Sequence, residues 1–182
     1  MIMRHGPTRP RYPLALIHPL GPLFQYLPLS LRRHLLYLRA HKRWGNFRTP
    51  RLWTEKMQWR VINDRRALLA VASDKLASKA LVAQIAARLN LDIRVPETLW
   101  VGTDVRELQA IADQLPTRWV LKPNSSSGRV RMMDRAIAPT DWNELARVGT
   151  QWMNDDEESG ALGHWGYSQA RRLLIAEERV GT

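Results

Sequence analysis

The chain has no cysteine among its 182 residues. It therefore forms no disulfide, and it has no thiolate to act as a nucleophile or metal ligand, which excludes a disulfide-stapled scaffold. It also lacks an uninterrupted apolar run of about 20 residues, the length that crosses a bilayer. The most apolar stretch, residues 14–29, is broken by three prolines, so we predict no transmembrane helix. A composition of 45% hydrophobic and 25% charged residues indicates a soluble globular protein.

Acidic residues are scarce in the N-terminal third of the chain. Residues 1–66 hold 14 Lys and Arg but only 2 Asp or Glu, whereas residues 67–182 hold 14 and 15, so the net charge of +11 belongs to the N-terminal third. Such a surplus suits nucleic acid, anionic lipid or a polyanionic substrate, or it is a solvated surface without a dedicated partner. The apolar stretch beside these arginines could lie on an anionic membrane, but we favour its packing on the domain.

Hydrophobic spacing predicts a chain of mixed α and β class. Expected helices start after Ser30, at Trp53, at Ser73, after Thr103 and after Pro139. Their expected buried residues are, in order, Leu31, Leu35 and Leu38; Trp53, Met57 and Val61; Leu81, Ile85 and Leu89; Val105, Leu108, Ile111 and Leu115; and Trp142, Leu145, Val148 and Trp152. Expected strands are residues 95–101, 118–123, 129–132 and 173–180. We divide the chain into a disordered basic tail (1–13), a basic helical segment (14–66) and a third region (67–182).

The most informative segment is residues 119–125 (WVLKPNS), an apolar run that carries Lys122 to the end of a strand. The polar residues 125–128 follow, and then Arg129 and Arg131 alternate with apolar residues as in a returning strand. A hairpin whose tip consists of small residues can fold over phosphate groups, because its amides and hydroxyls approach an anion closely. By itself, however, an apolar strand with a lysine and a proline is more often only a strand.

The order of the other segments strengthens this interpretation. A helix opens at residues 73–79 (SDKLASK), a strand follows at 94–101 (RVPETLWV), and after the hairpin a helix leads to residues 173–180 (LLIAEERV). This order resembles the nucleotide-binding core of the ATP-grasp fold. Within that fold, residues 54–59 (TEKMQW), Asp64-Arg65, Asp74-Lys75, 164–167 (HWGY) and 175–178 (IAEE) resemble the TupA-like family of teichuronopeptide biosynthesis. The resemblance covers roughly residues 52–182.

The resemblance implies an ATP site with two lysines that hold the phosphates. It assigns these roles to Lys75 on the helix and Lys122 on the strand; Lys79 lies one helical turn beyond Lys75, and spacing alone does not decide between them. The family's phosphate-covering loop corresponds to Ser125, Ser126, Ser127 and Gly128, although the family more often has Asn-His and further glycine here. The adenine hinge corresponds to Glu177, whose carboxylate would accept from the exocyclic amine, and to the backbone of Glu178, Arg179 and Val180.

The expected cofactors are ATP and, for the intact family, Mg²⁺. ATP-grasp enzymes hold magnesium in a C-terminal subdomain beyond the adenine hinge, and this chain ends at Thr182 just past that point. We therefore expect that subdomain to be largely missing, predict no magnesium ligands and no metal site in this chain, and assign no catalytic residue. The intact family's activity would be ATP-dependent ligation of a carboxylate to an amine; whether this chain is itself an enzyme stays open.

The resemblance implies a role in bacterial cell-envelope or capsular polysaccharide synthesis. The expected substrates are polyanionic glycans or amino acids, and a separate C-terminal half-protein is a candidate partner. An anionic membrane surface is a second candidate partner through the N-terminal third, and we predict no specific nucleic acid. The expected location is the cytoplasm, with peripheral binding to the inner membrane as a variant. The competing hypotheses are a non-catalytic basic module that docks polyanions or anionic membrane, and a poorly folding remnant.

Overall fold

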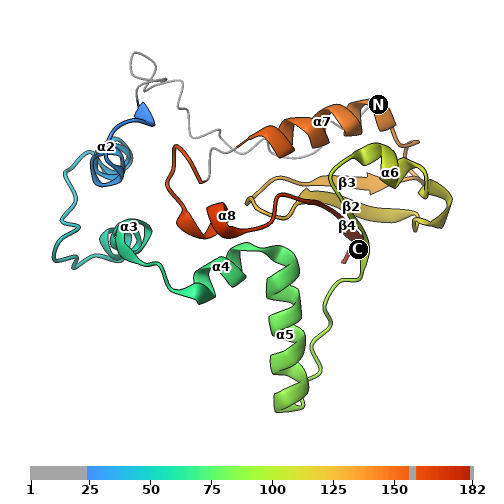
Figure 1. Ribbon diagram of the computed structural model, residues 1–182, viewed down its shortest axis with the longest axis horizontal. Coiled ribbons are helices and arrows are strands. Elements are labelled where there is room, and N and C mark those ends of the chain that lie inside the picture. Colours follow the sequence, from blue (N-terminus) through green and yellow to red (C-terminus); the bar gives the residue numbers. More distant parts are fainter. Residues whose placement is uncertain (1–23, 156–158, 181–182) are drawn as a thin grey trace. The chain divides into compact units, whose positions relative to one another are not determined.

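The computed structural model describes residues 24–155 and 159–180, which divide into two compact units (Figure 1). Unit 1 runs to Asp64 and includes Gly160–Gly163; unit 2 comprises Arg65–Ser159 and the chain from His164. The expected tail, residues 1–13, and most of the apolar stretch 14–29 lie outside the described residues. The described part contains seven α-helices and a four-stranded antiparallel sheet, which confirms the mixed α and β class. None of its helices is both long and apolar enough to cross a bilayer.

The sheet of unit 2 has the strand order β1-β4-β2-β3, and every neighbouring pair is antiparallel. Its strands are β1 (Thr98–Gly102), β2 (Arg118–Pro123), β3 (Arg131–Asp134) and β4 (Leu174–Glu178). Strands β2 and β3 form the expected hairpin, with Leu121 opposite Arg131. The last strand, β4, lies between β1 and β2, so three segments that are distant in sequence become neighbours.

One face of the sheet carries the hydrophobic core of unit 2. This face is covered by helix α6 (Val105–Gln109), which comes after β1, and by helix α7 (Trp142–Asn154), which comes after β3 (Figure 1). The 3₁₀ turn η2 (Ala112–Gln114) lies between α6 and β2. The buried side chains that pack together are Val105, Leu108, Leu115, Trp119, Leu121, Leu145, Leu174 and Ala176. The expected buried residues are therefore largely correct, but the helix expected after Thr103 is shorter: Asp104 caps α6, which ends at Gln109, so Leu115 lies beyond it. Asp141 caps α7 by accepting from the Glu144 amide at 3.0 Å.

Three further helices precede or interrupt the strands of unit 2. Helix α4 (Ala67–Ser73) packs on α8 (Trp165–Gln169), where Gly166 lies so close to α4 that an added Cβ would be 2.7 Å from the Leu69 carbonyl oxygen. Helix α5 (Lys75–Leu89) projects from the unit (Figure 1), and its first two turns bring Lys75 to the start of the hairpin loop and Lys79 to β1.

Unit 1 consists of α2 (Leu29–His41) and α3 (Trp53–Asn63) with the loop between them. Tyr37 is buried between the helices and shares a 3.0 Å hydrogen bond with Thr54. The ring of His34 stacks on Trp44 and on Phe47, with centroids 4.6 and 4.0 Å apart. Burial lowers the pKa of His34, which favours the neutral ring.

Several expected helix starts and one strand start are wrong. Helix α2 begins at Leu29 after Pro28, so Ser30 lies inside it and is not its N-cap. Helix α5 is capped by Asp74, because Ser73 still belongs to α4. Strand β1 begins at Thr98 rather than Val95, since residues 91–97 make no ladder. A serine before an apolar repeat predicts a cap only when no other helix ends there.

The expected buried faces of three helices are also wrong. Helix α2 buries Arg33 and Tyr37, while Leu31 and Leu38 are exposed; α3 buries Glu55, while Trp53 is 72% exposed. In α5 the apolar repeat is open to solvent, with Ile85 44% and Leu89 59% exposed. Helical spacing identifies a face, but which face is covered depends on the neighbouring elements.

Candidate functional site

The second face of the sheet carries a charged cluster at its centre. Alternation along β2 and β4 puts Trp119 and Leu121 on the core face and Lys122 on the opposite face, which it shares with Glu177 of β4. Val120 pairs with Glu177, so Lys122 lies diagonally across the two strands from that carboxylate. The Lys122 ammonium donates to Glu177 Oε1. Glu177 is 4% exposed, so the carboxylate depends on such partners.

A second lysine reaches the same carboxylate from helix α5. Lys79 Nζ lies 2.6 Å from Glu177 Oε2 and also donates to Thr98 Oγ1 and to the Pro96 carbonyl, each at 2.8 Å. Glu177 thus lies between two ammonium groups, and the ionised cluster has one excess positive charge. The cluster spans three neighbouring strands, because Thr98 of β1 pairs with Glu177 of β4, and Lys122 lies on β2.

Lys75, the lysine that the family motif favoured, has a different position. Its ammonium donates to the backbone carbonyls of Pro123, Asn124 and Ser126, where β2 passes into the hairpin loop. These contacts hold the beginning of the loop against the first turn of α5. The two lysines around Glu177 are therefore Lys79 and Lys122, while Lys75 supports the loop beside them. The i, i+4 spacing of Lys75 and Lys79 was the only signal in the sequence for this division of roles.

An ion pair below the loop ties the same segments together. Asp74 is 5% exposed and accepts from Arg171 Nε at 2.9 Å, Arg171 Nη2 at 3.0 Å and the Ala77 amide at 2.8 Å. Asn124 donates to the Arg171 carbonyl and accepts from the Leu76 amide. Burial by itself raises the pKa of Asp74, but the hydrogen bonds from Arg171 and Ala77 outweigh it and hold that pKa well below its usual range. The sequence offered no signal for this pair, whose members are 97 residues apart.

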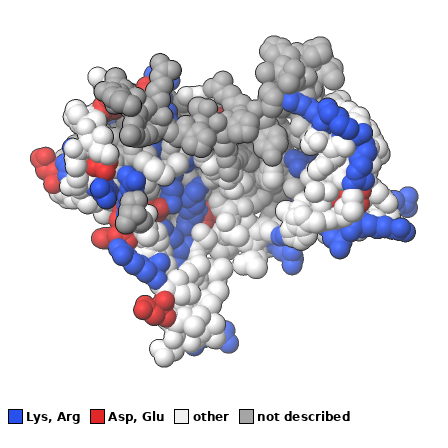
Figure 2. Space-filling model, turned by 180° about the vertical axis from the view of Figure 1, so that it is seen from behind, with Lys and Arg blue, Asp and Glu red and all other residues white. Residues whose placement is uncertain are grey.

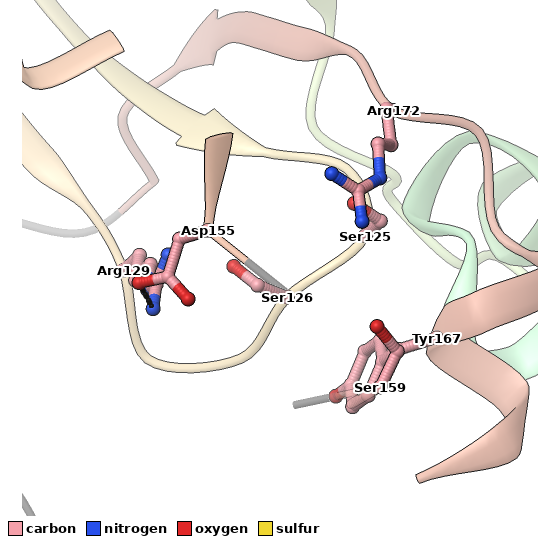
Figure 3. A pocket seen from close by; sticks show the side chains of 7 residues that line it. All are labelled: Ser125, Ser126, Arg129, Asp155, Ser159, Tyr167 and Arg172. Carbon is pink, nitrogen blue, oxygen red and sulfur yellow. Dashed lines mark hydrogen bonds and ion pairs between the residues drawn. The ribbon is translucent and has the colours of Figure 1, made fainter. Parts of the chain in front are cut away.

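The hairpin loop lines a small polar pocket (Figure 3). Its lining residues are Ser125, Ser126, Arg129, Asp155, Ser159, Tyr167 and Arg172. Arg129 pairs with Asp155, and Arg172 donates to the Met153 carbonyl at 3.3 Å. The Ser126 hydroxyl is buried, and among the described residues it has no hydrogen-bond partner. A buried hydroxyl without a partner is costly, so this atom is suited to a ligand that accepts or donates a hydrogen bond.

The remaining expected site residues have specific positions. Gly128 has a φ of 69°, which suits glycine in the loop, while Ser127 also lies in the loop but does not line the pocket. The Glu178 amide donates to the Glu97 carbonyl at 3.0 Å, so it is already engaged. The amide of Glu97 donates to the Glu178 carboxylate. This hydrogen bond and the nearby charge of Arg94 lower the pKa of Glu178.

The other end of the expected hinge has fewer contacts with the site. Arg179 lies 3.8 Å from Asp134 of β3, and Val180 is exposed. Within residues 24–155 and 159–180, no group of three or more His, Asp or Glu side chains is placed to hold a metal ion.

Comparisons of the chain with known protein families, with curated proteins and with solved structures found no match. Function is therefore inferred from the geometry of the charged cluster, the loop and the pocket.

Proposed function

We propose that this chain is an ATP-grasp protein of the TupA-like kind, which binds ATP between the charged cluster and the hairpin loop. The observation that carries the proposal is the placement of Lys79, Lys122 and Glu177 on one sheet face next to a serine-rich loop. Two ammonium groups from separate elements are suited to grip the phosphates of a nucleotide. The excess positive charge of the cluster also favours an anionic ligand over a neutral one.

The loop and the pocket carry polar groups that support binding of the phosphate end of such a ligand. The Ser126 hydroxyl can donate to a phosphate oxygen, and Arg172 adds a guanidinium at the pocket wall. Lys75 holds the backbone at the start of the loop. The small side chains of Ser125 and Ser126 can therefore approach the ligand while the start of the loop stays in place. The base of the nucleotide would lie along β4, where the chain continues through Arg179 and Val180; Glu177 would accept from the exocyclic amine in place of Lys79 or Lys122.

The proposed reaction class is the ligation of a carboxylate to an amine in cell-envelope or capsular polysaccharide synthesis. Bound MgATP would supply the phosphoryl group that activates the carboxylate. The residues of this chain would bind and orient the nucleotide. Cytoplasmic location and an acidic glycan or amino-acid substrate belong to the same proposal.

The test is a titration with ATP, with and without Mg²⁺, followed by thermal unfolding and calorimetry. We expect ATP to raise the melting temperature in proportion to ligand excess. Lys122→Ala should weaken ATP binding about 10–100-fold, because it removes a charge-assisted contact to phosphate. Arg147→Ala is the matched control, since Arg147 is exposed and, within the described part of the chain, pairs only with Glu144 on α7.

Loss of Lys122 also leaves Glu177 with one cation fewer, and the variant could unfold. A second variant, Ser126→Ala, removes one hydroxyl without a partner and keeps the ion pairs, and it should weaken ATP binding by about 2–10-fold. An unchanged ATP affinity in both folded variants would contradict the proposed site.

A further inference from the structure

The surface of unit 1 exposes cations without exposed acids. Its described part contains two acidic residues, Glu55 and Asp64, and both are buried. Glu55 is directed inward, where it accepts from the backbone amides of Asn46, Arg51 and Leu52, each at 3.2 Å. On the face of unit 1 seen in Figure 2, more lysine and arginine surface than acidic surface is accordingly visible.

Five of these cations belong to residues 42–56, which we name the basic segment. All five are exposed: Lys42, Arg43, Arg48, Arg51 and Lys56. Arg43 is engaged with Tyr37 and Glu55. Among the described residues, the side chains of the other four form no ion pair. An anionic surface that approaches the basic segment would therefore meet charges that are not compensated locally.

The basic segment also exposes large apolar side chains between its cations. Trp44 is 55% exposed, Leu52 is 46% exposed and Trp53 is 72% exposed. Leu52 and Trp53 are adjacent at the start of α3, directly after Arg51 and three residues before Lys56. Tryptophan rings favour the headgroup level of a bilayer, and an aliphatic side chain beside them gains by leaving water.

The loop that carries these side chains is held in one shape. Three backbone amides bind the Glu55 carboxylate, which lowers the pKa of Glu55 and keeps it ionised at neutral pH. Asn46 donates to Thr49 Oγ1 at 2.9 Å and accepts from the Thr49 amide at 3.1 Å, and Phe47 is buried beneath them. The backbone that carries the cations and the apolar side chains therefore needs no folding step on binding.

We propose that the basic segment docks the protein on an anionic lipid bilayer. Lys42, Arg48, Arg51 and Lys56 would contact the headgroups, and Leu52 and Trp53 would enter the interface. A nucleic acid backbone would use the cations but offers nothing to an exposed leucine, which is why a bilayer is favoured. The proposal concerns unit 1 and does not depend on ATP binding.

The test is co-sedimentation of the full chain with vesicles of phosphatidylcholine containing 30% phosphatidylserine. We expect binding at 0.1 M salt that falls at 0.5 M salt, and little binding to pure phosphatidylcholine. The variant R48Q/R51Q/K56Q should bind about 100-fold more weakly, since each cation near the surface contributes about fivefold. The matched control is R88Q/R106Q/R147Q, which removes three exposed cations from unit 2 and should bind like the unaltered chain.

The apolar part of the proposal is tested by L52S/W53A in the same assay. We expect this variant to lose the binding that persists at 0.5 M salt, because that part does not depend on charge. Equal losses in the two triple variants would overturn the proposal, because net charge alone would then explain binding. Tighter binding to a single-stranded oligonucleotide than to the vesicles at equal salt would also overturn it, and so would unchanged binding of L52S/W53A.

Discussion

Asp74 combines two roles at the residue scale. It caps α5 through the Ala77 amide, and it binds Arg171 with two hydrogen bonds, so one carboxylate connects the helix to the segment that leads into β4. Because Asp74 is almost fully buried while Arg171 is largely exposed, the cost of burial falls mainly on the carboxylate. A partner removed from such a pair leaves an uncompensated group behind.

We expect Asp74→Asn to lower the free energy of unfolding by about 2–3 kcal/mol at pH 7, since asparagine still caps the helix but cannot pair with Arg171. The folded-state pKa of Asp74 lies below its unfolded value, so its contribution is fully present above about pH 4 and is lost as the pH falls through the folded pKa. Urea unfolding at pH 7, 4 and 3 measures both effects. The difference in free energy of unfolding between the unaltered chain and Asp74→Asn should shrink in acid. A difference that stays constant with pH would contradict the role of the ionised Asp74 in pairing with Arg171.

Helix α7 shows at the element scale how close packing restricts sequence. Gly149 lies on its buried face, and a Cβ there would stand 2.7 Å from Val105 Cγ2 and 3.1 Å from Leu174 Cδ1. Glycine in the middle of a helix costs about 1 kcal/mol relative to alanine, so its presence has to be explained by space rather than propensity.

We expect Gly149→Ala to lower the free energy of unfolding by about 1–2 kcal/mol, because overpacking of the core outweighs the gain in helix propensity. Thr150→Ala, at the next and exposed position of α7, should change it by less than about 0.5 kcal/mol. Thermal unfolding of both variants is the measurement. A Gly149→Ala protein that is more stable than the unaltered chain would show that Val105 and Leu174 can move aside.

The helices and strands also differ in how well sequence patterns predicted their buried faces. The period-two alternation of residues 118–123 and the helical spacing of α6 and α7 predicted their buried faces, because those faces meet inside one local core. The same spacing failed in α5, where Ile85 and Leu89 are exposed, and in α2, where Arg33 is buried through hydrogen bonds to Gln58 and to the Leu162 carbonyl. Those outcomes depend on contacts from distant segments.

At the scale of the whole molecule, the two proposed functions belong to separate units. The charged cluster, the loop and the pocket are built from unit 2, whereas the basic segment belongs to unit 1. The two sets of residues belong to different compact units, so we expect substitutions in one set not to alter the other.

We therefore expect a double dissociation between ATP and vesicle binding. Lys122→Ala should lose most of its ATP-induced rise in melting temperature and still sediment with phosphatidylserine vesicles. R48Q/R51Q/K56Q should show the reverse pattern. Loss of both activities in either folded variant would indicate coupling between the units, which would require a revised account of both sites.

The sequence by itself determined what local geometry controls. It placed Lys122 near the end of a strand, followed by a hairpin of small residues, and it located the acidic pair 177–178 at the end of another strand. Side-chain alternation then places Lys122 opposite the core, whatever the neighbouring strand is.

Tertiary structure alone decided which residues meet. The order β1-β4-β2-β3 brings Glu177 beside Lys122, the first turns of α5 deliver Lys79 to that carboxylate, and Lys75 goes to the loop instead. The pairing of Asp74 with Arg171 and the pocket at Ser126 arise in the same way. Contacts between residues far apart in the chain depend on strand order and on helix packing, which no local spacing encodes.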